Sequence, residues 1–240
     1  MIRLGRFFFR YRNAIAPFFF LLIALDMVPI LQQPQARAGL IVAGLLIAIA
    51  GQALRAVAIG LVYIIRGGGR RKAIYADKLV TSGAFAHSRN PLYLGNILIV
   101  SGVAVAANSR LFLVFGVPAL VFAFCCIIAA EEHFLRAKFG DAYEQYCRRV
   151  NRFLPRFAGI GETFRSMTFN WTRVILKDYQ TIYAWTAGMT VLVWQDVWIA
   201  SRRAGESLAV WSFAAVLLLL TLAFLTAWFL KKMRLLRTTG

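Results

Sequence analysis

Two short stretches of this 240-residue chain combine residue types that can do chemistry. The first, residues 78–95 (KLVTSGAFAHSRNPLYLG), crowds Gly, Ser, His, Arg, Asn and Pro directly before a long apolar run. The second is the acidic pair Glu131 and Glu132, which comes at the end of the following apolar run. We expect the two stretches to meet at a membrane surface, where together they can hold a polar ligand.

The polar residues before the apolar run can be interpreted in two ways. Pro91 stands where a helix is expected to begin, and proline suits the first helical turn, so Asn90 and Pro91 fit a plain helix start. The first turn of a helix also offers free N–H groups and a partial positive charge to an anionic group. The guanidinium of Arg89 can add a positively charged, bidentate hydrogen-bond donor beside that site. The two glutamates are likewise either solvated carboxylates or acceptors for a ligand's hydroxyl groups.

The composition indicates an integral membrane protein. The chain is 60% hydrophobic with a mean hydropathy of +0.65, whereas soluble domains are about 45–50% apolar. The excess lies in long uncharged blocks. The net charge of +18 comes from Lys and Arg that flank these blocks. That placement is typical of membrane orientation, so we expect no nucleic-acid partner.

The apolar blocks predict an all-α, polytopic transmembrane helical bundle of about six spans. They cover residues 14–31, 38–65, 92–107, 111–130, 179–200 and 208–230. With six spans both termini share one side of the membrane, and most Lys and Arg fall on that side. Only four fall in loops on the other side: Arg37, Arg110, Arg202 and Arg203. The bias predicts that both termini and the polar stretches are cytoplasmic.

An amphipathic segment follows the fourth span. Its apolar side chains recur at helical spacing from residue 131 to residue 155: Leu135, Phe139, Tyr143, Tyr146 and Val150. This stripe fits a buried core, a partner interface or a cytoplasmic helix lying on the membrane, which nearby arginines favour. Residues 156–173 read as a linker. We therefore divide the chain into a core at 1–155 and a linker with a C-terminal hairpin at 156–240, a candidate for homodimer contacts.

Arg55 lies at membrane depth in the second span. An Arg there costs about 2.5–3.5 kcal/mol on insertion scales, so we expect it to face protein or a wet cavity. It either pairs structurally, with Asp26 as a candidate, or takes part in the site.

The three cysteines show no disulfide framework, and two histidines exclude a multi-histidine metal site.

Taken together, these motifs resemble the isoprenylcysteine carboxyl methyltransferase family, part of a wider group with phospholipid N-methyltransferases. The resemblance covers residues 51–155. It rests on the 78–95 stretch, the acidic pair, Gln52 to Ala58 in the second span, and a later FG-xx-Y-xx-Y-xxx-V-x-R-xx-P pattern.

The resemblance implies a membrane S-adenosylmethionine-dependent methyltransferase that acts on a membrane lipid or prenylated acceptor by carboxyl O-methylation or amine N-methylation. Its implied catalytic residues are Arg89, Glu132 and Arg55. Its implied cofactor contacts are Leu79, Val80, Phe85, Asn90, Pro91, Tyr93 and Glu131. For an amine acceptor, Glu132 is the first candidate base, so Glu132→Gln is expected to abolish turnover and leave cofactor binding largely intact.

Two positions depart from the prenylcysteine pattern. Asn90 replaces the family's histidine, so a histidine proton shuttle is excluded there. Ile127 replaces an arginine thought to engage the acceptor carboxylate, unless Arg55 or Arg89 substitutes. Two other functions stay open: an NADPH-dependent membrane reductase of the sterol-reductase type, which has a similar Tyr-Cys pair, and a non-enzymatic membrane scaffold.

Overall fold

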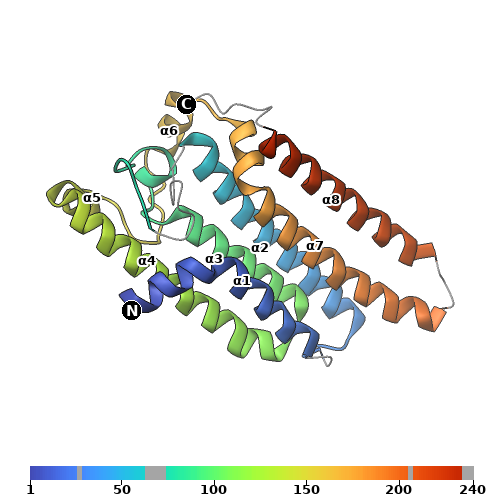
Figure 1. The fold of residues 1–240 in the computed structure, drawn as a ribbon. Helices are drawn as coiled ribbons and strands as arrows, with labels where there is room; N and C mark the ends of the chain where they lie inside the picture. The colour runs from blue at the N-terminus through green and yellow to red at the C-terminus, as the bar shows by residue number, and fades with distance from the viewer. Residues whose placement is uncertain (26–28, 63–73, 205–207, 234–240) are drawn as a thin grey trace.

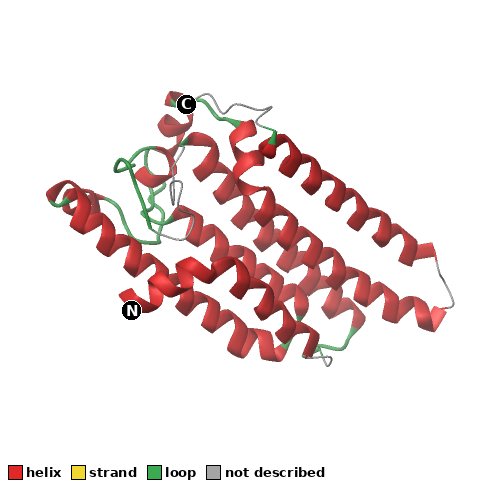
Figure 2. Ribbon diagram, in the orientation of Figure 1, coloured by secondary structure: helices red, strands yellow, loops and turns green. Residues whose placement is uncertain are grey.

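The computed structural model describes residues 1–25, 29–62, 74–204 and 208–233. All regular elements in these residues are helical, which confirms the all-α prediction (Figures 1 and 2). The long helices are α1 (Ile2–Leu25), α2 (Pro34–Leu61), α3 (Pro91–Ala107), α4 (Val117–Phe139), α7 (Trp171–Ala204) and α8 (Leu208–Lys232). The short elements are η1 (Gly83–Ala86), the π-helical turn η2 (Phe112–Gly116), α5 (Asp141–Arg149) and α6 (Ile160–Ser166).

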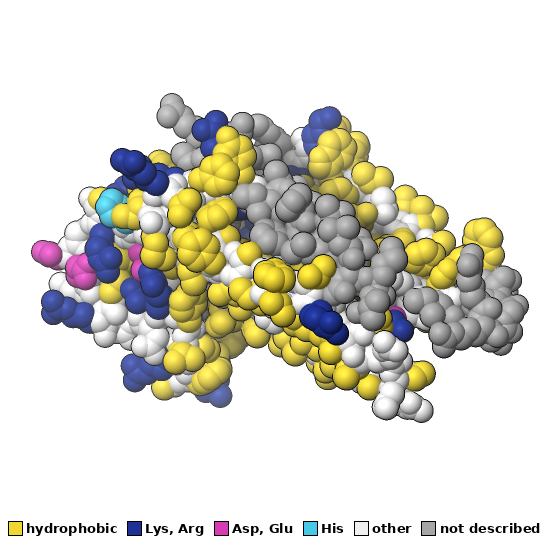
Figure 3. All heavy atoms as spheres, turned by 90° about the horizontal axis from the view of Figure 1, so that it is seen from below, with side chains coloured by type: hydrophobic (Ala, Val, Ile, Leu, Met, Phe, Trp, Pro, Cys, Tyr) yellow, Lys and Arg dark blue, Asp and Glu magenta, His cyan; other side chains and the backbone are white. Residues whose placement is uncertain are grey.

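Three helical stretches in the described residues are long and apolar enough to cross a membrane: Pro34–Leu61, Phe112–Phe139 and Trp211–Lys232. They coincide with the second, fourth and sixth predicted spans, and Pro91–Ala107 is a shorter apolar helix. On the face drawn in Figure 3, charged side chains gather at the end of the molecule that carries α5, and hydrophobic ones cover much of the middle. The chain is therefore an integral membrane helical bundle.

Small residues let α2 and α3 approach almost to backbone contact. A Cβ added to Gly51 of α2 would lie 2.6 Å from the carbonyl oxygen of Gly95 in α3, and Gly44 faces Gly102 in the same way. Helix pairs in membranes use small residues for this purpose, because close backbones gain van der Waals contact without a hydrophobic driving force. This contact fixes the position of the first turns of α3.

A tight turn then returns the chain along α3. Asn108 ends α3 in the left-handed conformation, with φ of 51°, which turns the chain sharply after the helix. Its side-chain Nδ2 donates to the carbonyl oxygen of Leu31, 2.8 Å away. The hairpin brings the start of α3 and the end of α4 to the same end of the bundle, which is where the two polar stretches lie.

A buried ion pair joins α7 to this core. Arg55 of α2 pairs with Asp178 of α7, which is 1% exposed, and Gln52 Nε2 donates to the same carboxylate at 2.7 Å. Trp185 Nε1 in turn donates to Gln52 Oε1 at 2.9 Å. A buried charge is tolerated when it is paired and hydrogen-bonded. The structural pairing expected for Arg55 is thus present, with Asp178 as its partner. Asp26, the candidate that the sequence offered, lies outside the described residues.

The predicted amphipathic segment is divided into two helices. α4 continues through the acidic pair to Phe139, and Gly140, with φ of 50°, separates it from α5, which ends at Arg149. The helix expected to reach residue 155 therefore ends earlier. The stripe side chains Tyr143 and Tyr146 are buried in an apolar cluster with Leu79. Of the three interpretations of the stripe, the structure has the buried core, with Tyr143, Tyr146 and Val150 buried and Leu135 and Phe139 partly buried.

Candidate functional site

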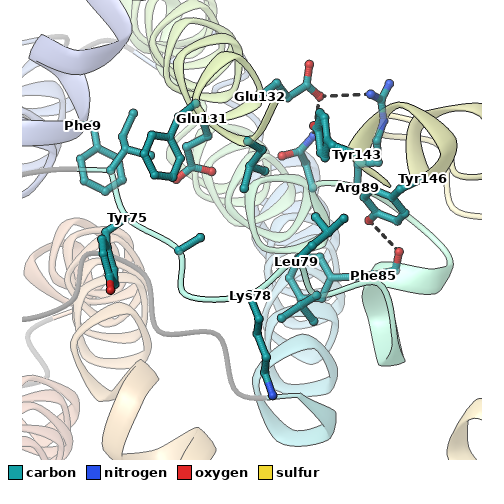
Figure 4. A pocket seen from close by; sticks show the side chains of 16 residues that line it. Phe9, Tyr75, Lys78, Leu79, Phe85, Arg89, Glu131, Glu132, Tyr143 and Tyr146 are labelled. Atoms are coloured by element: carbon teal, nitrogen blue, oxygen red, sulfur yellow. Dashed lines mark hydrogen bonds and ion pairs between the residues drawn. The ribbon is translucent and has the colours of Figure 1, made fainter. Parts of the chain in front are cut away.

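A pocket with an empty volume of about 670 Å³, part of it open to solvent, lies between the end of α4, α5 and the chain before α3. Residues 74–82, here called the strap, cross the pocket and supply one of its walls (Figure 4). Seven of the predicted site residues line it: Leu79, Val80, Phe85, Arg89, Asn90, Glu131 and Glu132.

The two polar stretches do meet, as the sequence predicts. The Tyr93 hydroxyl donates to Glu131 Oε1 at 2.9 Å, and Asn90 Nδ2 donates to Glu132 Oε1 at 3.4 Å. Both glutamates are buried. Each carboxylate of the acidic pair is therefore oriented by a residue at the start of α3, Glu132 by the N-cap Asn90 and Glu131 by Tyr93 of the first turn.

Three predicted residues do not line the pocket. Pro91 begins α3 and is buried behind the wall, and Tyr93 reaches the pocket through its bond to Glu131. Arg55 instead supports α3: its Nη1 donates to the Leu92 carbonyl oxygen at 3.4 Å and to Asn96 Oδ1. Arg55 therefore belongs to the ion pair with Asp178 of α7 and not to the pocket lining.

Glu132 is held by two arginines. Arg152 forks onto it, with Nε 3.1 Å from Oε1 and Nη2 2.6 Å from Oε2, and Arg89 Nη1 lies 3.6 Å from Oε1. Charge-assisted forks of this kind are among the stronger hydrogen bonds in proteins. A proton taken up by Glu132 would weaken all of these contacts, so the geometry favours a positioning role for Glu132.

Main-chain hydrogen bonds fasten the loop before α3 to the chain that follows α5. The Arg89 N–H donates to the Asn151 carbonyl oxygen, and the Arg156 N–H donates to the His87 carbonyl oxygen, each at 2.9 Å. Residues 151–156 contain the end of the V-x-R-xx-P pattern. That pattern therefore marks the segment that holds the pocket loop in place.

Arg89 has a mixed environment. Burial opposes its charge, but the Glu132 carboxylate and Cys147 outweigh burial and raise the pKa of the guanidinium. Its Nη1 contacts Cys147 Sγ at 2.9 Å. Within the described part of the chain, its buried Nε has no hydrogen-bond partner. Arg89 therefore places a permanent positive charge in the pocket wall, and its Nε–H can still donate a hydrogen bond to a ligand.

Two tyrosines of α5 line the pocket although the sequence identified them only as part of a pattern. Tyr146 donates from its hydroxyl to the Phe85 carbonyl oxygen at 2.8 Å and so holds η1 (Figure 4). Burial raises the pKa of the Tyr143 phenol, and the charge of Glu132 acts in the same direction. Their spacing on the amphipathic stripe was the signal that could have assigned them to the site.

Other pocket residues gave no signal in the sequence. Phe9 of α1 closes one end, together with Ile74 and Tyr75 of the strap. Gly5 brings α1 into backbone contact with Cys126 of α4, and Phe9 follows one helical turn later. This long-range crossing gives the pocket an apolar end opposite the charged one.

The arrangement suits a ligand that combines a flat or apolar group with charged and hydroxyl groups. Aliphatic and aromatic walls supply contact area, Arg89 can meet an anionic group, and Glu131 can accept hydrogen bonds or face a cation. In the residues that the structure describes, no three His, Cys, Asp or Glu side chains gather as a metal site would require.

A family model and two curated relatives match part of the chain. The family model described as phospholipid methyltransferase matches residues 38–142. The cobalt-zinc-cadmium resistance protein CzcN of Cupriavidus metallidurans is 33% identical over 122 residues, which are 49% of this chain and 52% of the relative. The nickel-cobalt-cadmium resistance protein NccN of Alcaligenes xylosoxydans xylosoxydans is 29% identical over 121 residues, 49% of this chain and 54% of the relative.

The chain spans about half the length of the curated relatives it matches. No solved structure matches it significantly. The matched segment contains the strap, the loop before α3 and the acidic pair, and so most of the pocket wall. Residues 38–142 are therefore similar to the phospholipid methyltransferase family, in line with the resemblance that the motifs in the sequence indicated.

Proposed function

We propose that this protein is a membrane methyltransferase that binds S-adenosylmethionine in the pocket and methylates an acceptor from the bilayer. The observation that carries the proposal is the union of the 78–95 stretch with Glu131 and Glu132 in one pocket at the end of apolar helices. The family match covers both pieces.

The residues in the pocket fit this cofactor. Leu79, Val80 and Phe85 offer an apolar wall for an adenine ring. Glu131, oriented by Tyr93, can accept hydrogen bonds from ribose hydroxyl groups. Arg89 carries the positive charge that the carboxylate of the methionine part needs, and its unpartnered Nε is a donor for it.

Bound S-adenosylmethionine supplies an electrophilic methyl group on a positively charged sulfur. The protein's tasks are to hold the acceptor's lone pair in line with that methyl group and to exclude water. Glu132 serves the first task by fixing Arg89, Asn90 and Arg152 around one carboxylate. Asn90 keeps its charge state at every pH, so it orients groups and shuttles no proton.

The acceptor is proposed to be a membrane lipid or a prenylated molecule that reaches the pocket at the cytoplasmic face. Ile127 is buried in an apolar cluster with Phe9 and Tyr93, so it offers an acceptor carboxylate no positive charge. Arg55 is committed to Asp178. Of the two arginines that could replace the family's carboxylate-binding arginine, only Arg89 lines the pocket, and the proposed cofactor already engages it. The proposed site therefore suits an amine acceptor better than a carboxylate acceptor.

The two relatives are named for metal resistance. Because the described residues contain no metal-holding cluster, we propose that a role of this chain in metal resistance would act through methylation of a membrane component.

Calorimetric titration of the purified, detergent-solubilised protein tests the proposed cofactor. We expect saturable binding of S-adenosylmethionine and of its product S-adenosylhomocysteine, and no binding of NADPH. Binding of NADPH without either sulfur compound would establish the reductase alternative instead. Binding of none of the three would favour the scaffold.

A further inference from the structure

The segment between α5 and α7 carries large apolar side chains on its surface. In residues 154–171, here called the interfacial segment, Leu154 is 76% exposed, Phe157 is 71% exposed and Trp171 is 67% exposed. Ile160 and Phe164 are exposed as well. Large apolar side chains clustered on a surface mark contact with a partner or a membrane.

This segment lies level with the end of a membrane-length helix. The Asn170 N–H donates to the Gly60 carbonyl oxygen at 3.0 Å, at the last turn of α2. The Phe169 ring packs so closely there that a Cβ on Gly60 would lie 2.5 Å from it. Since α2 is apolar enough to span a bilayer and ends at Leu61, the end of the interfacial segment at Phe169 and Asn170 lies beside the end of a membrane-length helix.

The exposed charges around these apolar side chains are mainly positive. Arg156 and Arg165 lie within the segment, and Arg148 and Arg149 lie just before it, all exposed. Glu162 is the acidic residue of the segment. An anionic membrane surface attracts each such residue by about 1 kcal/mol. Aromatic and aliphatic side chains interleaved with arginines are typical of segments that lie in a membrane interface.

We propose that the interfacial segment lies in the headgroup layer of an anionic leaflet, with Leu154, Phe157 and Trp171 dipping into the acyl boundary. The membrane contact expected for the amphipathic stripe, which α5 buries, is then made by the next part of the chain. The proposal depends on the membrane nature of the fold and holds whether or not the pocket transfers methyl groups.

The interfacial segment is also hydrogen-bonded to the loop before α3, which lines the pocket. The His87 ring bridges to it through Nδ1, 2.6 Å from the Arg156 carbonyl oxygen, and Nε2, 2.9 Å from Thr163 Oγ1. His87 precedes Arg89 by two residues, so lipid contact at the segment sets the depth of the pocket relative to the headgroups. A lipid-borne acceptor would then meet the pocket without leaving the bilayer.

Fluorescence quenching by brominated lipids tests the proposal. The full chain, as the Phe157→Trp variant, is reconstituted in phosphatidylcholine and phosphatidylglycerol vesicles whose acyl chains are brominated close to the headgroup. Emission of the unsubstituted protein is subtracted. Gln145→Trp, on an exposed position of α5, is the matched control.

We expect the added emission of Phe157→Trp to be quenched at least roughly twofold more than that of Gln145→Trp. Omitting phosphatidylglycerol, or combining Phe157→Trp with Arg156→Gln and Arg165→Gln, should reduce that quenching. Equal quenching of both probes would overturn the proposal. Emission that is shielded from lipid and changes with protein concentration would also overturn it, in favour of contact with a second copy of the chain.

Discussion

Arg152 grips the carboxylate of Glu132 with two parallel hydrogen bonds, Nε to Oε1 at 3.1 Å and Nη2 to Oε2 at 2.6 Å. The arginine comes from the chain after α5 and the glutamate from α4, so these two hydrogen bonds join two segments beside the pocket. Arg89 approaches the same carboxylate from the loop before α3. The negative charge of Glu132 thus organises three parts of the pocket.

Glu132→Gln separates this positioning role from that of a catalytic base. The substitution removes the charge that holds Arg89 and Arg152, so we expect turnover to be lost and the Kd for S-adenosylhomocysteine to rise roughly tenfold. Calorimetric titration measures the Kd. An unchanged Kd with no turnover would contradict the positioning role and restore the base hypothesis that the sequence suggested.

Tyr93→Phe is expected to weaken cofactor binding without unfolding the protein. The variant leaves the ring in its apolar cluster but removes the hydroxyl that orients Glu131. Loss of one hydrogen bond to a charged group costs about 1.5–3 kcal/mol, or roughly a tenfold to hundredfold rise in Kd. Tyr183→Phe is the control, because the Tyr183 hydroxyl lies 3.3 Å from Thr221 Oγ1 on α8 and not in the pocket. Equal Kd values for the two variants would argue against a role of Tyr93 in the site.

Asp178→Asn is expected to lower the stability of the bundle strongly. It leaves Arg55 buried without its counter-charge, and breaking a buried pair in this way costs about 3–5 kcal/mol. Asp196→Asn removes the partner of Arg37, in a pair whose side chains are about a quarter exposed, and should cost less than about 1 kcal/mol. Thermal unfolding in detergent, followed by circular dichroism, compares the two. Similar midpoints would show that the buried pair does not fasten α7.

The raised pKa of Tyr143 predicts a pH dependence at the alkaline end. The phenol is neutral when protonated, and its pKa in the folded protein lies above the unfolded value of about 10. Its contribution to stability is therefore complete below about pH 10 and is lost as the pH rises further. Ultraviolet absorbance titration of the protein minus that of Tyr143→Phe should show no phenolate from this residue at pH 10. Ionisation of Tyr143 near pH 10 would contradict its burial beneath the pocket.

The meeting of the two polar stretches could be predicted because it depends on local features. A short turn at Asn108 joins two apolar helices, so the start of the first and the end of the second must lie at one end. The residue types at those two ends then give the site its charge. Most of the predicted pocket residues lie where this simple geometry puts them.

What the sequence could not give depends on long-range packing. Arg55 needed a counter-charge, but nothing in the sequence distinguishes Asp178, more than a hundred residues away, from the nearer Asp26. Periodicity identified the stripe on α5 but not what covers it. Phe9 reaches the pocket only because Gly5 permits α1 to cross α4 at backbone distance.

Transfer of a labelled methyl group tests the central claim most directly. Membranes that contain the protein are incubated with S-adenosylmethionine labelled in its methyl group, and the lipid extract is analysed by mass spectrometry. Membranes with Tyr93→Phe and Glu132→Gln variants serve as controls. We expect a labelled lipid-like product that forms with the unsubstituted protein, falls with Tyr93→Phe and is absent with Glu132→Gln. The same labelling in membranes with and without the protein would contradict the assignment of a methyltransferase.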